Sequence, residues 1–363
     1  MIAKRLTVNN FRNLKNASVA LSEKVNVFLG ENGMGKTNLL EAQWLFTAQK
    51  SFRPAKDSDL IKIGEEKAEI ELEFFAESRM QKAEIALSRI ARRKVFLNEI
   101  EQKPVSSFFG KINAIIFSPE HLQLVKEGPS LRRRFLDTAI SQISPKYYAA
   151  LALYKKTLDQ RNAILRDVKK NHAFYDTLPI WNERLASAGA VLIYLRKGYT
   201  ALLSKHACKI YDEISSQSEK LSMEYACSVD DGGTYEDIKE RFLDKLSEDK
   251  TAELALRTTL HGPHRDDLRL MKNDLEAKSY ASQGQQRSIV LALKLAEAEI
   301  LSCEGKSPII LLDDVMSELD AKRREFVLCK TGGKQVIITA CDEKSINAGK
   351  NAAVFHIKDG AVL

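Results

Sequence analysis

Cysteine is scarce in this sequence and follows no pattern that marks a metal site or a disulfide framework. The 363 residues contain five cysteines, an odd number, and no two of them form a Cys-x-x-Cys pair. Scattered thiols of this kind indicate neither structural zinc nor a set of disulfide bonds.

Long apolar runs are also missing. No run approaches the roughly 20 residues that a membrane-spanning helix needs, and residues 1–6 do not resemble a signal peptide. We therefore expect a cytoplasmic protein without a membrane partner. The apolar content of 44% is ordinary for a protein with a real core, and the net charge of +7 suits an anionic partner such as a nucleic acid or a nucleotide.

The most informative segment that is present is a complete phosphate-binding loop. Residues 30–37 read Gly-Glu-Asn-Gly-Met-Gly-Lys-Thr, between a strand-like run at 25–29 and a helix-like stretch at 38–48. The glycines let the backbone curl, so that its N–H groups point at a polyphosphate on a helix N-terminus. Lys36 would neutralise the β- and γ-phosphates, and the Thr37 hydroxyl would ligate Mg²⁺. A plain glycine turn is the alternative.

A second segment supplies two carboxylates. The apolar run 309–312 predicts a buried parallel strand and is followed by Asp313 and Asp314. Asp313 would reach Mg²⁺ directly or through water, and Asp314 is placed to orient or deprotonate the attacking water. A buried strand that ends in a solvated acidic turn is the alternative. Lys36 and Asp314 are the predicted catalytic residues.

A third segment lies just before the helix-like stretch 288–301. It consists of Ser282, Gln283, Gly284, Gln285 and Gln286. A hydroxyl, a glycine N–H and a helix N-terminus together form a second anion site. Two such sites can act on one γ-phosphate only if they face each other, which two chains in head-to-tail symmetry allow. A polar N-cap for the following helix is the alternative.

The periodicity of the chain predicts a discontinuous α/β domain. Strand-like alternation dominates the first 120 residues, for example at 68–76 and 83–87, and buried strands and a C-terminal hairpin return at 308–312, 334–339 and 354–363. We therefore predict a nucleotide-binding head formed by residues 1–128 and 258–363.

Between the two halves of the head lie two helical stretches with heptad spacing, at 151–168 and 185–202, separated by a break at Pro179. In the first, Arg161 interrupts the apolar positions Leu151, Tyr154, Leu158, Leu165 and Val168. These stretches predict a helical arm inserted at 129–257.

The order of these motifs, together with Ser317-Glu318-Leu319-Asp320, resembles the ATP-binding-cassette heads of chromosome-maintenance proteins. More specifically, the chain resembles the RecF family of bacterial recombination-mediator ATPases from end to end. The stretches that carry this resemblance are Asn10–Leu14, Gly35–Ala42, Ser51–Arg53, Phe117–Glu120, Arg132–Asp137, Gly262–Asp267 and Leu312–Asp320.

The resemblance implies an α/β fold with an ABC-type P-loop ATPase head, in which a mixed sheet is joined to an antiparallel β lobe. It also implies which residues bind ATP and Mg²⁺. The predicted ATP-binding residues are Gly30, Glu31, Asn32, Gly33, Met34, Gly35, Lys36, Thr37, Asn38 and Arg12, and the predicted metal ligands are Thr37 and Asp313.

The remaining implied roles concern the dimer and the γ-phosphate. Residues 282–286 would contact the nucleotide of a partner subunit, and Asp320 would lie at the dimer seam. Asp314 stands where related heads usually carry Glu, so the shorter side chain implies slow hydrolysis. Thr339 stands where many such heads carry a switch His, and Glu120 stands roughly at the place of a metal-contacting Gln.

The function implied is ATP-dependent DNA binding in recombinational gap repair and replication-fork maintenance. ATP would close a homodimer on double-stranded DNA near gaps or single-stranded DNA, a weak DNA-stimulated ATPase would reopen it, and RecO and RecR would be partners in recombinase loading. A small-molecule P-loop kinase and a transport-type ATPase subunit remain alternatives. The absence of Cys-x-x-Cys and of a long coiled coil excludes the zinc-hooked repair ATPases.

Several charged residues are weaker candidates. Arg12 and Arg53 could touch phosphate oxygens or be surface arginines. The basic runs 92–94 and 132–134 could meet the DNA backbone or form solvated faces. For His264, a structural hydrogen-bonding role is favoured over a catalytic one.

Overall fold

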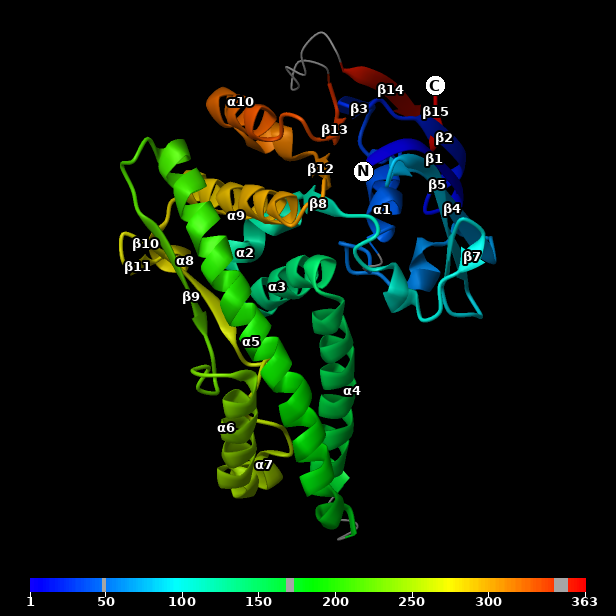
Figure 1. Ribbon diagram of the computed structural model, residues 1–363. Helices are drawn as coiled ribbons and strands as arrows, with labels where there is room; N and C mark the ends of the chain where they lie inside the picture. The colour runs from blue at the N-terminus through cyan, green and yellow to red at the C-terminus, as the bar shows by residue number, and fades with distance from the viewer. Residues whose placement is uncertain (48–49, 168–172, 343–351) are drawn as a thin grey trace. The chain divides into compact units, whose positions relative to one another are not determined.

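The chain forms two compact units in the computed structural model, which describes residues 1–47, 50–167, 173–342 and 352–363 (Figure 1). Unit 1 consists of Met1–Gln123, Ile210–Gln217 and Gln283–Leu363, and unit 2 of Leu124–Lys209 and Ser218–Ser282. Unit 1 is discontinuous in sequence, as a head with an insertion requires. The boundaries nevertheless differ from the predicted ones, because residues 124–128 and 258–282 lie in unit 2 and residues 210–217 lie in unit 1.

Unit 1 contains an antiparallel sheet in the order β2-β1-β4-β5-β6-β7. In β4, the buried residues Ala68, Ile70, Leu72 and Phe74 alternate with more exposed neighbours, because successive side chains of a strand point to opposite faces. This alternation is the one that the sequence predicts. The strands are β1 (Ile2–Phe11), β2 (Leu14–Ala20), β4 (Lys67–Ala76), β5 (Arg79–Ser88), β6 (Lys94–Leu97) and β7 (Ile100–Glu101).

A second sheet of unit 1 has the order β15-β14-β3-β13-β12-β8 and holds the predicted buried strands. Its strands are β3 (Val25–Leu29), β8 (Ala114–Phe117), β12 (Ile309–Asp313), β13 (Val336–Ala340), β14 (Ala353–Lys358) and β15 (Ala361–Val362). All neighbours pair in parallel except β14 and β15, which form the predicted C-terminal hairpin. Residues 309–312 are at most 1% exposed, which explains their continuous apolar run.

A buried glutamine joins the two sheets. The Gln335 side-chain amide exchanges two hydrogen bonds of 2.8 Å with the backbone of Ala3 in β1, and it donates a third, of 2.7 Å, to the carbonyl of Ser22. Every polar group of a buried amide needs a partner. Gln335 therefore ties the start of β13 to β1 of the antiparallel sheet and to Ser22.

The helices of unit 1 pack on the parallel strands. α1 (Lys36–Leu45) packs against β12 and β13, and α9 (Gln283–Cys303) packs against β8 (Figure 1). α10 (Ala321–Lys330) follows β12, and residues 210–215 of α5 (Ala173–Ser215) also belong to this unit. Short 3₁₀ turns complete it: η1 (Asp57–Leu60), η2 (Val105–Phe108), η3 (Pro119–Leu122) and η4 (Val315–Glu318).

Unit 2 contains more than a pair of helices. A small antiparallel sheet, in the order β11-β10-β9, accompanies the helices, and its strands are β9 (Leu221–Ala226), β10 (Asp267–Lys272) and β11 (Leu275–Glu276). The helices that begin or lie in it are α2 (Gln123–Lys126), α3 (Pro129–Ile143), α4 (Pro145–Asp167), the first part of α5, α6 (Tyr235–Glu248), α7 (Lys250–Leu256) and α8 (Ala277–Tyr280). Among the described helices of both units, none is long and apolar enough to cross a membrane.

Arg161 does not interrupt the buried face of α4, and this prediction is wrong. Its side chain is 1% exposed and donates to Glu253 at 2.5 Å, to Thr259 at 2.7 Å and to Asn182 at 2.8 Å. A buried guanidinium is stable only when such partners satisfy its donors. Arg161 is therefore part of the core that it was expected to break.

Pro179 does not break the second helix either. α5 continues through Pro179, close to its first described turn, where proline removes one backbone hydrogen bond. At the end of the stretch 185–202, the predicted heptad position Leu202 is 47% exposed and its neighbour Leu203 is buried, since an α-helix repeats every 3.6 residues and drifts from a heptad pattern. Val168 lies outside the described residues.

Candidate nucleotide-binding site

The phosphate loop lies between β3 and α1, as its sequence predicts. Gly33 and Gly35 have φ values of 84° and 110°, a left-handed region that disfavours other residues. Gly35 caps α1 without a side-chain hydrogen bond, so the first N–H groups of the helix face the loop. A helix start of this kind attracts anions.

The Lys36 ammonium group is held inside the curl of the loop. It donates to the carbonyl oxygens of Gly30 and Glu31, the latter at 3.1 Å, and lies 3.5 Å from Cys341 Sγ. Lys36 is only 6% exposed. A cation beside the loop backbone can neutralise phosphate oxygens that bind to the loop.

Asp313 lies beside the loop at the carboxyl end of β12. Its Oδ1 accepts hydrogen bonds from the hydroxyls of Thr37, at 2.7 Å, and Thr339, at 2.9 Å. Burial raises the pKa of Asp313, and the two threonine hydroxyls and Arg53 counteract that rise only in part. A buried carboxylate that receives only hydroxyl donors is suited to a cation.

The oxygens of Thr37 and Asp313 fit a magnesium ion. Two adjacent ligands of an octahedral Mg²⁺ at about 2.1 Å are about 3 Å apart, and the two oxygens here are 2.7 Å apart. Among the residues that the structure describes, no cluster of three or more His, Cys, Asp or Glu could hold a metal ion. The donor set therefore fits an ion that is shared with phosphate oxygens, rather than a cage made by protein alone.

Asp314 and Thr339 are connected through the backbone. The N–H of Asp314 donates to Thr339 Oγ1 at 2.9 Å, and Asp314 has a φ of 53°. The single hydroxyl proton of Thr339 goes to Asp313, so Thr339 fixes the double-aspartate turn. Its predicted role at the γ-phosphate, and the predicted catalytic role of Asp314, stay predictions.

Glu120, in η3, lies within electrostatic reach of this cluster, because its charge contributes to the raised pKa of Asp313. The carboxylate is exposed. Its contact with the metal also stays a prediction.

A fully buried glutamate, which sequence reasoning missed, forms ion pairs with both candidate arginines. Glu41 in α1 accepts two hydrogen bonds from Arg12, at 2.9 and 2.8 Å, one from Arg53 at 2.6 Å, and one from Ser51. Burial alone would raise the pKa of Glu41, but these hydrogen bonds outweigh it and lower the pKa below its ordinary value. The sequence signal that could have revealed this cluster is a charged residue, Glu41, among the apolar residues of α1. The phosphate contacts predicted for Arg12 and Arg53 stay predictions.

A second group of residues braces the loop from outside. Asn13 Nδ2 donates to the carbonyl of Gly33 at 3.0 Å, and Asn38 donates to Asn13 Oδ1 at 2.7 Å. On the C-terminal hairpin, the N–H of Gly360 donates to Met34 O at 3.0 Å. A side chain at Gly360 would meet the Asn13 carbonyl at 2.6 Å, so the hairpin fits against the loop only with glycine there.

The segment 282–286 stands at the start of α9. The helix begins at Gln283, and Ser282, directly before it, is the last residue of unit 2. Arg287 of α9 pairs with Glu318 at 2.7 Å, next to the predicted seam residue Asp320. Asp320 caps α10: its Oδ1 accepts from the N–H of Arg323 at 2.9 Å, which is the main reason that its pKa is lowered.

His264, in unit 2, has structural partners. Tyr154 Oη lies 2.7 Å from its Nδ1, and the carbonyl of Thr259 lies 3.2 Å from its Nε2. Burial lowers the pKa of His264 to about 4, so the ring is neutral at physiological pH. These contacts favour the structural interpretation.

The two basic runs are largely engaged in ion pairs or hydrogen bonds. Arg132 forms a two-pronged pair with Asp267 at 2.7 and 2.8 Å, Arg133 donates to the carbonyl of Asp266 at 2.7 Å, and Arg93 pairs with Asp57 at 2.6 Å. These contacts within the protein favour a structural role for Arg132, Arg133 and Arg93. The exposed members of the two runs are Arg92, Lys94 and Arg134.

The loop, the double aspartate and the mixed sheet that carries them define the class of protein: a P-loop ATPase head of the ATP-binding-cassette type, as found in the SMC-like proteins. The family model described as RecF/RecN/SMC N terminal domain matches residues 2–362. A "DNA replication and repair protein RecF" from Ruminiclostridium cellulolyticum is 38% identical over 368 residues, which cover 100% of this chain and 99% of the relative. The chain belongs to the RecF family.

Solved structures agree with this assignment. A structure described as "the recombination mediator protein RecF-ATP in RecFOR pathway" has a TM-score of 0.92 and 37% identity, and the match covers 100% of this chain and 97% of the other. An Smc head bound to the C-terminal winged-helix domain of ScpA has a TM-score of 0.59 and 14% identity, covers 100% and 96%, and shows the shared fold alone. The predicted family and fold class are confirmed, and the kinase and transport alternatives are not favoured.

Proposed function

We propose that this protein is an ATP-dependent DNA-binding protein of recombinational gap repair and replication-fork maintenance. The observation that carries the proposal is the Thr37 hydroxyl bonded to buried Asp313, next to the lysine of an intact phosphate loop. The names of the relatives, which refer to DNA replication and repair and to an ATP-bound state, support the biological setting.

In this proposal the loop binds ATP through the backbone of residues 30–38 and through Lys36. The uncapped start of α1 and the ammonium group both favour the phosphate charge. Thr37 and Asp313 would hold Mg²⁺, which would neutralise charge on the β- and γ-phosphate oxygens. The raised pKa of Asp313 supports this role, because a divalent cation would stabilise the charged carboxylate.

Hydrolysis would be slow and stimulated by DNA. Asp314 would orient or deprotonate the attacking water, but its short side chain must reach from a turn whose backbone is tied to Thr339. A base that has little freedom to approach the water is consistent with a weak ATPase. ATP would then act mainly as a clamp between two subunits.

The closed state would be a homodimer in which residues 282–286 and Asp320 of one protomer cap the nucleotide of the other. This segment would place the N-terminus of α9, which begins at Gln283, at a phosphate of the partner's nucleotide. Because ATP would bind the dimeric arrangement more tightly, it would stabilise the dimer by mass action.

DNA would bind the closed dimer through its backbone phosphates, which the net charge of +7 favours. Double-stranded DNA with gaps or single-stranded stretches would be the substrate. RecO and RecR would be partners in loading the recombinase, and this part rests on the pathway named for the ATP-bound neighbour.

Light scattering of the intact protein, with and without ATP and gapped DNA, tests the proposal. Wild-type protein should double in mass with ATP, whereas Lys36→Ala should stay monomeric. DNA should raise the turnover of ATP, and its affinity should fall steeply with salt. Dimerisation of Lys36→Ala that equals the wild type, or wild-type protein that turns over ATP as a monomer and ignores DNA, would refute the proposal.

A further inference from the structure

Arg323, on the first turn of α10, contacts two segments at once. Its Nε donates to Ser288 Oγ at 2.9 Å and its Nη2 to the carbonyl of Gly284 at 3.4 Å, both in the first turns of α9. Its Nη1 pairs with Asp320 Oδ2, and its backbone N–H donates to Asp320 Oδ1 at 2.9 Å. One guanidinium group therefore spans from the Asp320 turn to the start of α9.

The geometry points to Arg323 as a positioning residue that sets the face which one protomer presents to the nucleotide of the other. This inference rests on the proposed ATP-clamped dimer. The segments that Arg323 joins, 282–286 and Asp320, are the ones that would cap the partner's nucleotide. Arg323 would touch neither ATP nor water, and it would act by holding these segments in one relative position.

The chemistry of the guanidinium group suits this task. Its planar group presents several donors in fixed directions, so it can satisfy a hydroxyl, a carbonyl and a carboxylate together. A lysine is a single point charge and could keep the Asp320 pair, but it could not make all three contacts. The Ser288 hydroxyl also donates to the Gly284 carbonyl at 3.1 Å, which closes the network at the helix start.

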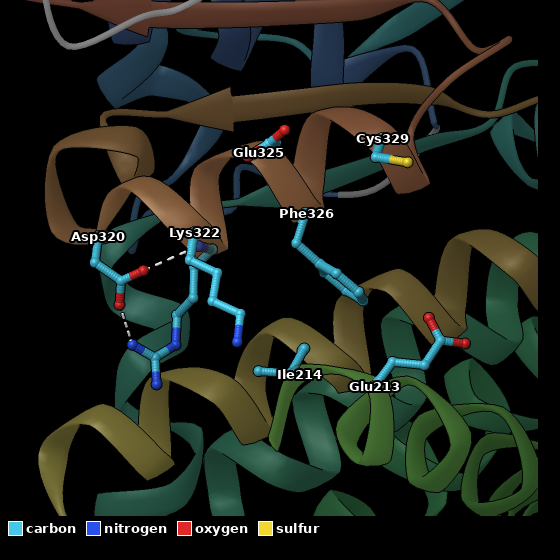
Figure 2. Close-up of a pocket in the computed structure, with 8 residues that line it drawn as sticks. Glu213, Ile214, Asp320, Lys322, Glu325, Phe326 and Cys329 are labelled. Carbon is cyan, nitrogen blue, oxygen red and sulfur yellow. Dashed lines mark hydrogen bonds and ion pairs between the residues drawn. The ribbon is translucent and has the colours of Figure 1, made fainter. Parts of the chain in front are cut away.

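Arg323 also borders an open pocket, which leaves room for its side chain to move. The pocket has a volume of about 440 Å³ and lies between α10 and the end of α5, with Ile214 and Phe326 among its lining residues (Figure 2). The side chain of Arg323 is 29% exposed. The hydrogen bonds, rather than close packing on every side, therefore determine where the guanidinium group lies.

The first test compares Arg323→Ala with Lys322→Ala. Lys322 is the neighbouring exposed residue on α10 and lines the same pocket, so its removal gives the same change in charge. Arg323→Ala should raise the protein concentration at the midpoint of ATP-driven dimerisation about tenfold, since charge-assisted hydrogen bonds are lost. ATP binding to the monomer should change less than about twofold, and Lys322→Ala should behave as wild type. Arg323→Lys should recover part of the dimerisation.

A mixing experiment separates this role from a general loss of fold. Lys36→Ala should lose ATP binding but keep an intact capping face, whereas Arg323→Ala should bind ATP but hold its capping face less firmly. A mixed dimer should contain one intact composite site, so at a protein concentration where neither variant dimerises alone, mixing the two should restore measurable ATP turnover. Circular dichroism spectra of both variants should match the wild type.

The outcomes distinguish the two ideas. If wild-type protein does not dimerise with ATP, the proposed function fails and the inference with it. If wild-type protein dimerises, and Arg323→Ala dimerises and hydrolyses ATP equally well, only the role of Arg323 is overturned. The same holds if Arg323→Ala weakens ATP binding to the monomer as much as it weakens dimerisation, or if mixing restores no turnover.

Discussion

Two buried carboxylates of the head, Glu41 and Asp313, have opposite surroundings. Glu41 is 0% exposed and is surrounded by two arginines and a serine, and its pKa is lowered. Asp313 is 5% exposed and receives two threonine hydroxyls, and its pKa is raised. Glu41 therefore has its cations within the fold, whereas among the residues that the structure describes no cation is directly bonded to Asp313.

These different surroundings lead us to expect different roles for the two carboxylates. A buried ion pair with complete hydrogen bonding loses much when one partner is removed, because a charge is left buried and unpaired. A buried carboxylate with only neutral donors is destabilising until a cation arrives. Glu41 is thus expected to serve stability, and Asp313 to serve the binding of Mg²⁺.

The largest effect should come from Glu41→Gln. Loss of the carboxylate leaves Arg12 and Arg53 without their shared anion, and we expect the free energy of unfolding to fall by about 3–5 kcal/mol. Urea denaturation measures this change. Glu23→Gln, which removes an exposed carboxylate paired with Lys4, is the control and should leave stability almost unchanged. A loss for Glu41→Gln no greater than that of the control would show that Glu41 is not the centre of this cluster.

The second effect should come from Asp313→Asn, and it should separate stability from binding. Without nucleotide the neutral amide removes a buried charge, so stability should stay equal or rise. With saturating MgATP the wild type should gain about 2.7–4.1 kcal/mol, the gain expected at ligand concentrations of 100 to 1,000 times Kd, and the variant should lose most of it. Thermal unfolding with and without MgATP measures both. An equal gain in the variant would remove Asp313 from the metal site.

A third, smaller effect concerns pH. The lowered pKa of Glu41 contributes stability that is present above its ordinary value of 4.5 and is lost as the pH falls through the lower folded-state value. The raised pKa of Asp313 has the opposite sign: its burial destabilises the fold at neutral pH, and this penalty shrinks as the pH falls below the raised value and is gone below the ordinary value of 3.8.

Two differences in stability should therefore shrink on acidification. The difference between wild type and Asp313→Asn should be gone once the pH is below 3.8, and the difference between wild type and Glu41→Gln should begin to shrink only below pH 4.5. Urea titrations at several pH values test both changes. Differences that stay constant with pH would contradict the assignment of the two charges.

The smallest effect should come from Thr339→Val. The change removes one donor to Asp313 and the acceptor of the Asp314 N–H, so we expect a loss of about 1–2 kcal/mol and a weaker response to Mg²⁺. Thr339→Ser keeps the hydroxyl and is the control. If both variants behave as wild type in unfolding and in Mg²⁺ titration, Thr339 does not organise the double-aspartate turn.

Continuous segments of the sequence predicted much of the head. The loop at 30–37 needs glycines at positions with positive φ, and Gly33 and Gly35 have such values. The apolar run before Asp313 became a central parallel strand, because only a strand covered on both faces is apolar throughout. These features depend on neighbours in the chain, so periodicity and turn chemistry reveal them.

The partners of isolated charges could not be predicted in the same way. Arg161 looked like a defect in a heptad pattern, and its partner Glu253 is 92 positions away. Arg12 and Arg53 were expected to be either phosphate contacts or surface arginines, and no sequence pattern predicted that both pair with Glu41. No local pattern relates such residues, because packing and strand register alone bring them together.

The amino-acid sequence by itself determined the loop, the aspartate strand and the RecF family resemblance, since each is a local arrangement of backbone and side chains with its own chemistry. Only the tertiary structure decided which charges are neutralised within the protein, and that buried Asp313 receives two threonine hydroxyls whereas buried Glu41 receives two arginines. The physical reason is that desolvation and ion pairing depend on distances between residues that lie far apart in the chain.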